Sequence, residues 1–255
     1  MAATHTDILM YHSIADAPGP TSIAPDIFRA QIEAIVAAGI PVVSLDDLLD
    51  ARAGGTPLPA NALIITFDDG FQDFADTAWP VMQDHNISPI VYIPTAHVGR
   101  AENWQGAHDP ARPLMGWSDI RDLANAGVSF GSHTVSHPDL TTLPADALGA
   151  ELTRARETLE DKLGRAVPHF APPYGQSTPA VRSAIANHYQ TSVGTRLGRA
   201  KPTADVFDLP RLEMFYFTDI ARWKNHLAQK GTAYLQTRRL MREVREVISK
   251  PWHRA

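Results

Sequence analysis

Two adjacent carboxylates, Asp68 and Asp69, directly follow the apolar run 63–67 and precede Gly70. An apolar, β-branched run of this length is typical of a strand buried on both faces, so the two acids are expected to leave the core where the strand ends. Neighbouring carboxylates repel each other unless a cation or a shared proton relieves the repulsion. The pair therefore predicts a metal site or a carboxyl dyad, and the simpler alternative is a polar turn in which Asp caps the next helix.

Two histidines four residues apart, His133 and His137, follow another short apolar run at 128–130. This spacing places both imidazoles on one face of a helical turn, and in a tight loop it lets them converge on one ion. Such a pair taken alone is also compatible with ordinary structural histidines. Combined with a strand-end carboxylate, two imidazoles make a standard ligand set for a catalytic metal ion with open coordination positions.

The segments that must position these residues alternate between strand-like and helix-like about seven times in 255 residues, without a repeat or a linker. This alternation predicts one α/β domain. Polar residues follow successive strands, which favours a parallel barrel, because chemistry in such barrels lies at the C-terminal strand ends. Pro80 is expected to kink or split its helix. The predicted strands are 6–11, 42–43, 63–67, 90–93, 128–130, 169–171, 191–193 and 209–214, and the predicted helices are 25–38, 46–53, 74–85, 118–126, 144–163, 179–187 and 234–250.

The composition excludes several classes of protein. The chain has no cysteine, which excludes disulfides and thiolate metal sites, and a net charge of −5 gives no basic surface for nucleic acid. Residues 1–11 contain no basic region followed by an apolar run, and no apolar run approaches the roughly 18 residues of a membrane span. We therefore expect a soluble, cytoplasmic protein.

Three segments resemble the motifs of a known family. The sequences TFDDG at 66–70, GSHTVSH at 131–137 and FAPPYG at 170–175 are similar, in order and spacing, to the first three motifs of the polysaccharide deacetylases, carbohydrate esterase family 4. The resemblance covers roughly residues 6–215, and MYHS at 10–13 resembles the branch that acts on exopolysaccharide and adhesin poly-N-acetylglucosamine. It implies a distorted (β/α)7 barrel and metal-dependent removal of acetyl groups from N-acetylated sugars.

The resemblance also implies roles for individual residues. Asp69, His133 and His137 would ligate a divalent metal ion, Asp68 would act as the general base, and the backbone N–H of Tyr174 would bind the oxyanion. Zinc is the predicted ion, with cobalt and nickel as alternatives, because imidazole and carboxylate ligands suit all three. Amide hydrolysis agrees with this assignment, since it requires a Lewis acid on the carbonyl oxygen and a deprotonated water beside it.

The chain departs from the family pattern at two points. Ala171 stands where many members have an Arg that orients the general base, and the Leu-x-His motif that supplies the general acid in many members is not found. We hypothesise that Arg211 supplies the missing guanidinium, with an ordinary surface Arg as the alternative. For the general acid, His12 is the first candidate and His226 the second, and return of the proton by Asp68 is a third route.

The long polar loop 95–113 is expected to be functional or mobile. Trp104 in this loop, together with Trp117 and Tyr174, could stack on sugar rings, whereas simple packing in the fold is the alternative for the tryptophans. His97 and His108 are expected to be solvated loop residues.

The segment 231–255 is predicted to be a basic amphipathic helix and tail that follow a deacetylase barrel at 1–230. Docking onto the barrel or onto a second subunit, giving a homodimer, is one interpretation, and peripheral contact with an anionic inner membrane leaflet is the other. Its apolar residues are Leu240, Met241, Val244, Val247 and Ile248, and its basic residues include Arg238, Arg239, Arg242, Arg245 and Lys250.

The leading functional hypothesis is N-deacetylation of N-acetylglucosamine units in a bacterial exopolysaccharide or its lipid-linked precursor. Two alternatives remain at this stage. An O-acetyl carbohydrate esterase could use the same site, because an ester has the easier leaving group. A sugar-binding module with lost activity would account for the absent Arg and the absent terminal His.

Overall fold

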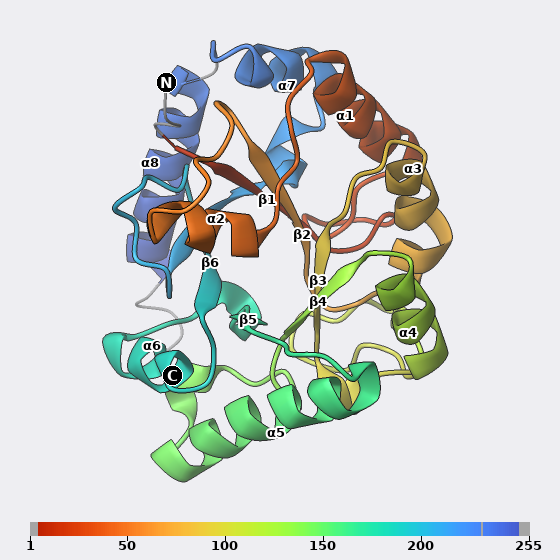
Figure 1. The fold of residues 1–255 in the computed structure, drawn as a ribbon, viewed down its shortest axis with the longest axis vertical. Coiled ribbons are helices and arrows are strands. Elements are labelled where there is room, and N and C mark those ends of the chain that lie inside the picture. The colour runs from red at the N-terminus through yellow and green to blue at the C-terminus, as the bar shows by residue number, and fades with distance from the viewer. Residues whose placement is uncertain (1–4, 231, 250–255) are drawn as a thin grey trace.

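A computed structural model describes residues 5–230 and 232–249, and it shows seven parallel strands that close into a barrel in chain order, as predicted (Figure 1). Each strand pairs with the next one along the chain, and β7 pairs with β1 to close the ring. The strands are β1 (Asp7–Tyr11), β2 (Leu63–Phe67), β3 (Ile90–Ile93), β4 (Ser129–Ser132), β5 (His169–Phe170), β6 (Thr191–Leu197) and β7 (Leu209–Glu213).

Helices surround the strands on the outside of the barrel (Figure 1). The predicted helix 74–85 is split in two, as Pro80 suggested: a π-helical turn, Phe74–Ala78, leads into a short α-helix that has Pro80 in its first turn. The α-helices are α1 (Pro25–Ala37), α2 (Leu45–Arg52), α3 (Trp79–Gln83), α4 (Trp117–Asn125), α5 (Ala145–Leu163), α6 (Pro179–Ala186), α7 (Ile220–Leu227) and α8 (Thr232–Ser249).

Alternate residues of each strand face the barrel interior or the helix layer. On β1, Ile8 packs with the interior core, whereas Leu9 and Tyr11 pack with residues of α1. The same alternation puts Ile64 on the interior face of β2 and Leu209 on that of β7. Side chains two residues apart on a strand share a face. Asp68, four residues after Ile64, and Arg211, two residues after Leu209, therefore lie on the interior face, toward the barrel mouth.

The barrel is distorted at two places. β5 contains only two residues, and the pairing of β6 with β7 shifts register between Val193 and Leu197. The predicted strand at 42–43 is wrong: Val42 forms only an isolated bridge with Leu63, because Ser44 immediately caps α2 and ends the extended backbone.

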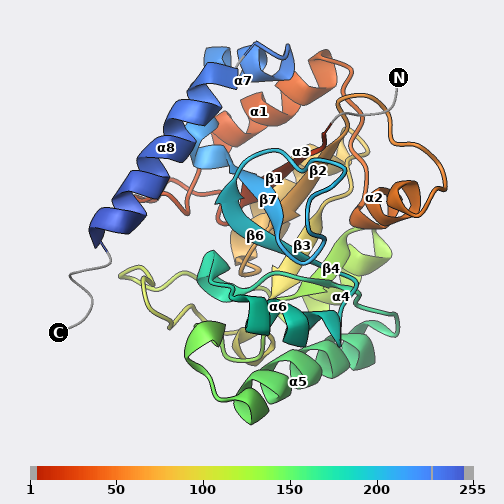
Figure 2. The ribbon, with the colours of Figure 1, turned by 90° about the vertical axis from the view of Figure 1, so that its left-hand side faces the viewer.

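Helix α8 runs from beside α7 down one side of the molecule (Figure 2). Tyr234 fixes its first turns, because the Tyr234 hydroxyl donates a hydrogen bond to the Tyr216 carbonyl oxygen at 2.9 Å. None of the described helices combines the length and the apolar character needed to cross a membrane. The predicted tail at 250–255 lies outside the described residues, and the predicted division of the chain at residue 230 stays a prediction.

Candidate active site

Three residues that are far apart in the sequence meet at the mouth of the barrel. The Oδ1 atom of Asp69 lies 3.3 Å from Nε2 of His133 and 3.2 Å from Nε2 of His137, and all three side chains are buried. Their candidate ligand atoms all lie within 4.8 Å of one another. Two neutral imidazoles and one carboxylate in this arrangement fit a divalent transition-metal ion and leave coordination positions open.

The surrounding backbone fixes the orientation of these ligand residues. Nδ1 of His133 lies 2.6 Å from the carbonyl oxygen of Ala171, so that Nδ1 donates a hydrogen bond and Nε2 is directed toward Asp69. Asp69 and His137 have left-handed backbones with φ of 73° and 59°, and Thr134, between the histidines, has φ of 71°. Such values are uncommon for residues other than glycine, and they cluster at functional sites where the surrounding structure holds the strain.

Asp68 extends from the interior face of β2 and is held by Arg211 from β7. The two guanidinium nitrogens Nη1 and Nη2 donate to the two carboxylate oxygens of Asp68, each at 2.7 Å. Arg211 also donates to the Thr66 hydroxyl at 3.0 Å and to the Gly194 carbonyl oxygen at 2.8 Å. The structure thus places Arg211 where the hypothesis requires it, buried and bound to the candidate base.

The ionisation of the carboxylates and imidazoles in the site depends on burial and on their charged neighbours. Burial raises the pKa of Asp68, but the charge and hydrogen bonds of Arg211 outweigh this and hold the pKa below its usual value. Burial likewise raises the pKa of Asp69, but hydrogen bonds from His133 and His137 lower it well below the usual range. Burial lowers the pKa of His137, which favours the neutral imidazole that a metal ligand requires, whereas the pKa of His133 is raised, because Asp69 and Asp68 outweigh its burial.

A cavity of about 270 Å³ opens over these residues. His12, half-buried just after β1, lines it with Nε2 3.9 Å from Oδ2 of Asp68. Tyr174 lines it from the loop after β5, has a left-handed backbone with φ of 58°, and is 38% exposed. The structure therefore brings all seven predicted site residues to one end of the barrel, and their chemical roles stay predictions.

An aromatic wall covers one side of the metal-ligand set. The ring of Trp104 stacks on the ring of His137 with centroids 4.2 Å apart, and the ring of Tyr174 meets His137 edge-on at 4.9 Å. Trp117, in contrast, begins α4 and packs against the hydrophobic core, as the packing alternative predicted. Trp104 and Tyr174 thus remain the aromatic candidates for contact with a substrate.

Two predictions about loop histidines are wrong. His97 is buried, with its Nε2 3.3 Å from the Ser136 carbonyl oxygen and its ring against Trp104, because the long loop folds over the cavity, which Trp104 lines. His108 is partly buried and ties this loop to the loop after β1, with Nε2 2.8 Å from the Pro18 carbonyl oxygen.

The prediction of His226 as a second candidate acid is also wrong. Its Nε2 lies 2.8 Å from Oδ2 of Asp7, the first residue of β1, and the side chain is buried. Asp7 and Asp68 lie at opposite ends of the parallel barrel, so His226 cannot reach the cavity. Site residues were located in the sequence by their place directly after a strand. His226 lies on α7, which is followed by α8 and not by a strand, so this rule could not place it.

Several residues of the cavity were missed in the sequence, among them two charged residues that lie far apart in the chain from the matched motifs. Glu213 ends β7 and Arg242 lies on α8, and both line the cavity together with Asp68 and His12. Glu213 could have been found, because it is two residues after Arg211 and therefore shares its face of the strand. Arg242 could not, because nothing in the sequence states which part of the barrel a C-terminal helix covers.

Comparisons with known proteins agree with this geometry. The family model described as polysaccharide deacetylase matches residues 55–193, more than half of the chain. The poly-beta-1,6-N-acetyl-D-glucosamine N-deacetylase of Escherichia coli K12 is 26% identical over 141 residues, which cover 49% of this chain and only 20% of that protein. The chain thus spans about a fifth of this relative.

Solved structures share the fold. The Streptococcus pyogenes deacetylase PplD has a TM-score of 0.72 at 22% identity, with 82% of this chain and 92% of that chain covered. IcaB from Ammonifex degensii also has a TM-score of 0.72 at 22% identity, covering 88% of this chain and 98% of that one. The barrel described above is therefore an architecture that both of these structures have.

Proposed function

The chain belongs to the polysaccharide deacetylase family, a family of hydrolases, and from this premise we propose that it removes the N-acetyl group from N-acetylglucosamine units of a bacterial exopolysaccharide or its lipid-linked precursor. The observation that carries the proposal is the pairing of a buried, Arg-bound carboxylate, Asp68, with the adjacent Asp69–His133–His137 set at the floor of one cavity. The Escherichia coli relative, named for this activity, supports the choice of sugar.

The ligand set supports a resident divalent ion, which we propose to be zinc, with cobalt or nickel as substitutes. When bound, such an ion supplies Lewis acidity toward the acetyl oxygen and toward water. The ligand residues themselves fit this use, because His133 is oriented by the Ala171 carbonyl and His137 is held by the hydroxyl of Thr134, which accepts its backbone N–H at 3.0 Å.

We propose that Asp68 accepts the proton of the attacking water. Because its pKa is held low, Asp68 is ionised at neutral pH, and the two hydrogen bonds from Arg211 keep the carboxylate in one orientation. Addition of water to the amide carbonyl and cleavage of the C–N bond release acetate and a free amine. The amine nitrogen receives one proton as it leaves, from His12 or from Asp68, and the backbone N–H of Tyr174 is the proposed donor to the oxyanion.

The test is acetate release from N-acetylglucosamine tetramer and from an O-acetylated sugar, with metal content measured on the same protein. The proposal expects release from the tetramer, lost by at least about 100-fold in Asp68→Asn with the metal retained. Release from the O-acetylated sugar alone would instead identify an esterase. Release from neither substrate by the metal-loaded protein would favour a sugar-binding module.

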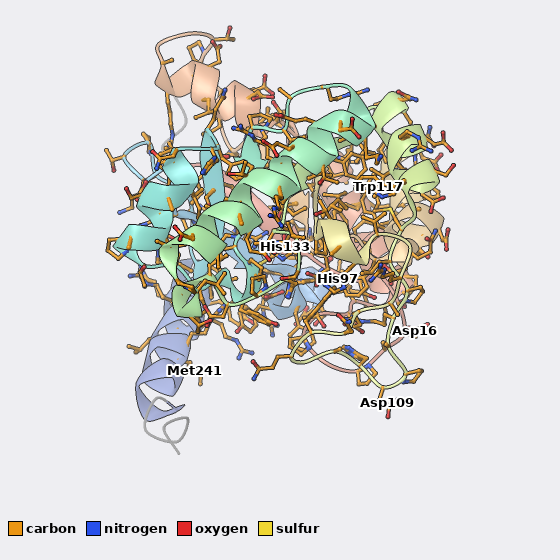
Figure 3. All side chains as sticks on the ribbon, turned by 90° about the horizontal axis from the view of Figure 1, so that it is seen from below. Asp16, His97, Asp109, Trp117, His133 and Met241 are labelled. Carbon is orange, nitrogen blue, oxygen red and sulfur yellow. The ribbon has the colours of Figure 1, made fainter. Side chains whose placement is uncertain are left out.

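We also propose that α8 makes peripheral contact with an anionic membrane surface, where a lipid-linked substrate would be met. Leu240 and Met241 are 61% and 60% exposed on this helix, and Arg239 is exposed next to them in the sequence. Figure 3 shows the position of Met241 on α8. Such apolar and basic neighbours suit an interfacial helix. Flotation with anionic vesicles tests this proposal, which expects salt-sensitive binding lost in Leu240→Glu. Absence of binding, together with dimerisation in sedimentation, would assign the same face to a second subunit.

A further inference from the structure

We propose that Glu213 and Arg242 form a substrate-binding pair on the cavity wall that faces the metal-ligand residues, so that helix α8 is part of the substrate site. This inference rests on the proposed function, because it specifies how the site holds a chain of sugar units. Both residues lie outside the part of the chain that the family model matches.

The topology of the barrel places Glu213 across the mouth from the ligand histidines. Glu213 ends β7, beside Met10 of β1, whereas His133 follows β4. In a closed ring of seven strands, β4 and β7 are three places apart, which is the greatest separation that the ring allows. A ligand in the cavity can therefore have its acetyl group on the β2 and β4 side while another part contacts Glu213.

Among the described side chains, those of residues 5–230 and 233–242, none forms a hydrogen bond or an ion pair with the carboxylate of Glu213. The side chain is half-buried at the cavity, so the protein shields part of the carboxylate from water. Burial raises the pKa of Glu213, and the charge of Asp68 adds to this, while His12, Arg242 and Arg211 act in the opposite direction. A carboxyl group that lines a cavity without a hydrogen-bond partner is a feature expected of a binding residue rather than of a structural one.

Arg242 comes from the face of α8 that is turned toward the barrel. Tyr234, Arg238 and Arg242 recur every four residues, so they share this face. Tyr234 is fixed to Tyr216, and Nε of Arg238 donates to the Tyr234 hydroxyl at 3.1 Å. Leu240, on another face, is instead turned outward. The position of Arg242 at the cavity is thus set by the docking of the helix.

The chemistry of the pair favours hydroxyl groups as ligands. Glu213 and Arg242 line the same cavity, and no ion pair joins their described side chains, so a ligand in the cavity can contact both. Two opposite charges have no net charge to select an ion. A carboxylate accepts and a guanidinium donates, and a sugar hydroxyl does both. The pair therefore suits a neutral glycan that extends from the acetylated unit.

The test is direct binding of N-acetylglucosamine tetramer, measured by calorimetry on zinc-loaded protein that carries Asp68→Asn to prevent turnover. Adding Arg242→Ala or Glu213→Gln is expected to raise Kd about tenfold, the effect typical of losing a hydrogen bond to a charged group. Arg239→Ala removes the same charge from an exposed position of the same helix and should leave Kd unchanged. The inference is overturned if Arg242→Ala binds as tightly as Arg239→Ala, or if the Asp68→Asn protein does not bind the tetramer.

Two further measurements separate this inference from its alternatives. In the otherwise wild-type protein, Arg242→Ala should raise KM for the tetramer about tenfold and leave hydrolysis of 4-nitrophenyl acetate, which is too small to span the cavity, unchanged. An equal loss on both substrates would indicate a structural role and overturn the inference. Failure of the proposed function would show differently, as no acetate release from the tetramer even though binding of the tetramer still depends on Arg242.

Discussion

Arg211 and Asp68 are 143 positions apart in the sequence, yet they are joined by two hydrogen bonds of 2.7 Å each in the interior of the barrel. The contact exists because β7 closes the ring against β1, beside β2, and because both residues lie on the interior faces of their strands. Arg211 is 1% exposed and Asp68 is 4% exposed. Bidentate pairing of this kind fixes the plane of the carboxylate as well as its charge, which is the requirement for a general base that must face one water molecule.

Removal of the guanidinium should affect both stability and turnover. Arg211→Ala leaves a buried carboxylate without its partner, and we expect a loss of about 3–5 kcal/mol in the free energy of unfolding. Turnover should fall by about 100-fold or more, whereas metal content should stay stoichiometric. Arg211→Lys should not restore turnover, because an ammonium cannot form the bidentate contact. Urea unfolding, acetate release and elemental analysis measure these effects, and unchanged turnover in Arg211→Ala would contradict the role.

Loss of a ligand imidazole should lower metal content as well as turnover. His137→Ala removes one of three candidate ligands, so we expect metal content after dialysis to fall well below one ion per chain, and turnover to fall by about 100-fold or more. His85→Ala, at an exposed position, is the matched control and should retain both. Full metal occupancy in His137→Ala would show that the ion, if present, is held elsewhere.

The same site predicts that a chelator destabilises the protein. An ion that binds only the folded state stabilises it by about 2.7 kcal/mol at a free concentration 100 times its Kd. For a chain of this size, removal of the ion should therefore lower Tm by about 5–10 °C, reversibly on addition of zinc. Calorimetric scans with and without chelator measure the shift, and Asp69→Asn should show none. An equal shift in Asp69→Asn would place the stabilising ion at another site.

The parallel barrel and the metal-ligand set were accessible from the sequence because each depends on local patterns. Buried strands show as apolar runs, and a residue that follows such a run lies at the barrel mouth whatever its distance along the chain. Asp69, His133 and His137 all meet this condition. Arg211 was accessible through its place on the predicted strand 209–214, although only the structure shows that its guanidinium reaches Asp68.

The errors concern residues whose positions depend on packing over long distances. His226 lies on a helix, and its contact with Asp7 places it at the end of the barrel away from the cavity. Only the packing of the helix against the barrel shows this. His97 is buried because the loop that contains it folds back over Ser136 and Trp104, and a polar sequence gives no sign of this. The contribution of α8 to the cavity through Arg242 has the same origin.

His12 can be tested through the difference between two leaving groups. If His12 protonates the departing amine, His12→Ala should lower turnover of the N-acetylated tetramer by about 100-fold, because an amine is a poor leaving group without a proton. Hydrolysis of 4-nitrophenyl acetate should change little, because nitrophenolate leaves without protonation. Kinetics on both substrates provide the measurement. An equal loss on both would assign His12 to binding or to the water, and no loss on either would exclude it.

The ionised Glu213 side chain should make the folded protein less stable at neutral pH than a neutral side chain at the same position would. Its pKa is raised in the folded state by burial and by Asp68, so the folded protein binds this proton more tightly than the unfolded chain. The resulting stability is present below the pKa of the unfolded chain, about 4.3, and is lost as pH rises through the folded pKa. Glu213→Gln removes the ionisation. We therefore expect the variant to have a higher free energy of unfolding than the wild type at pH 7, with a gain that shrinks as pH approaches 4.

Urea unfolding of both proteins between pH 4 and pH 8 measures this difference. Glu157→Gln, at an exposed position on α5, is the matched control and should show no comparable gain at pH 7. A Glu213→Gln variant that is less stable than the wild type at neutral pH would show that the ionised carboxylate has a stabilising partner in the protein. The expected result for Glu213→Gln is higher stability together with weaker sugar binding. This combination is typical of a residue whose role is in binding and not in stability.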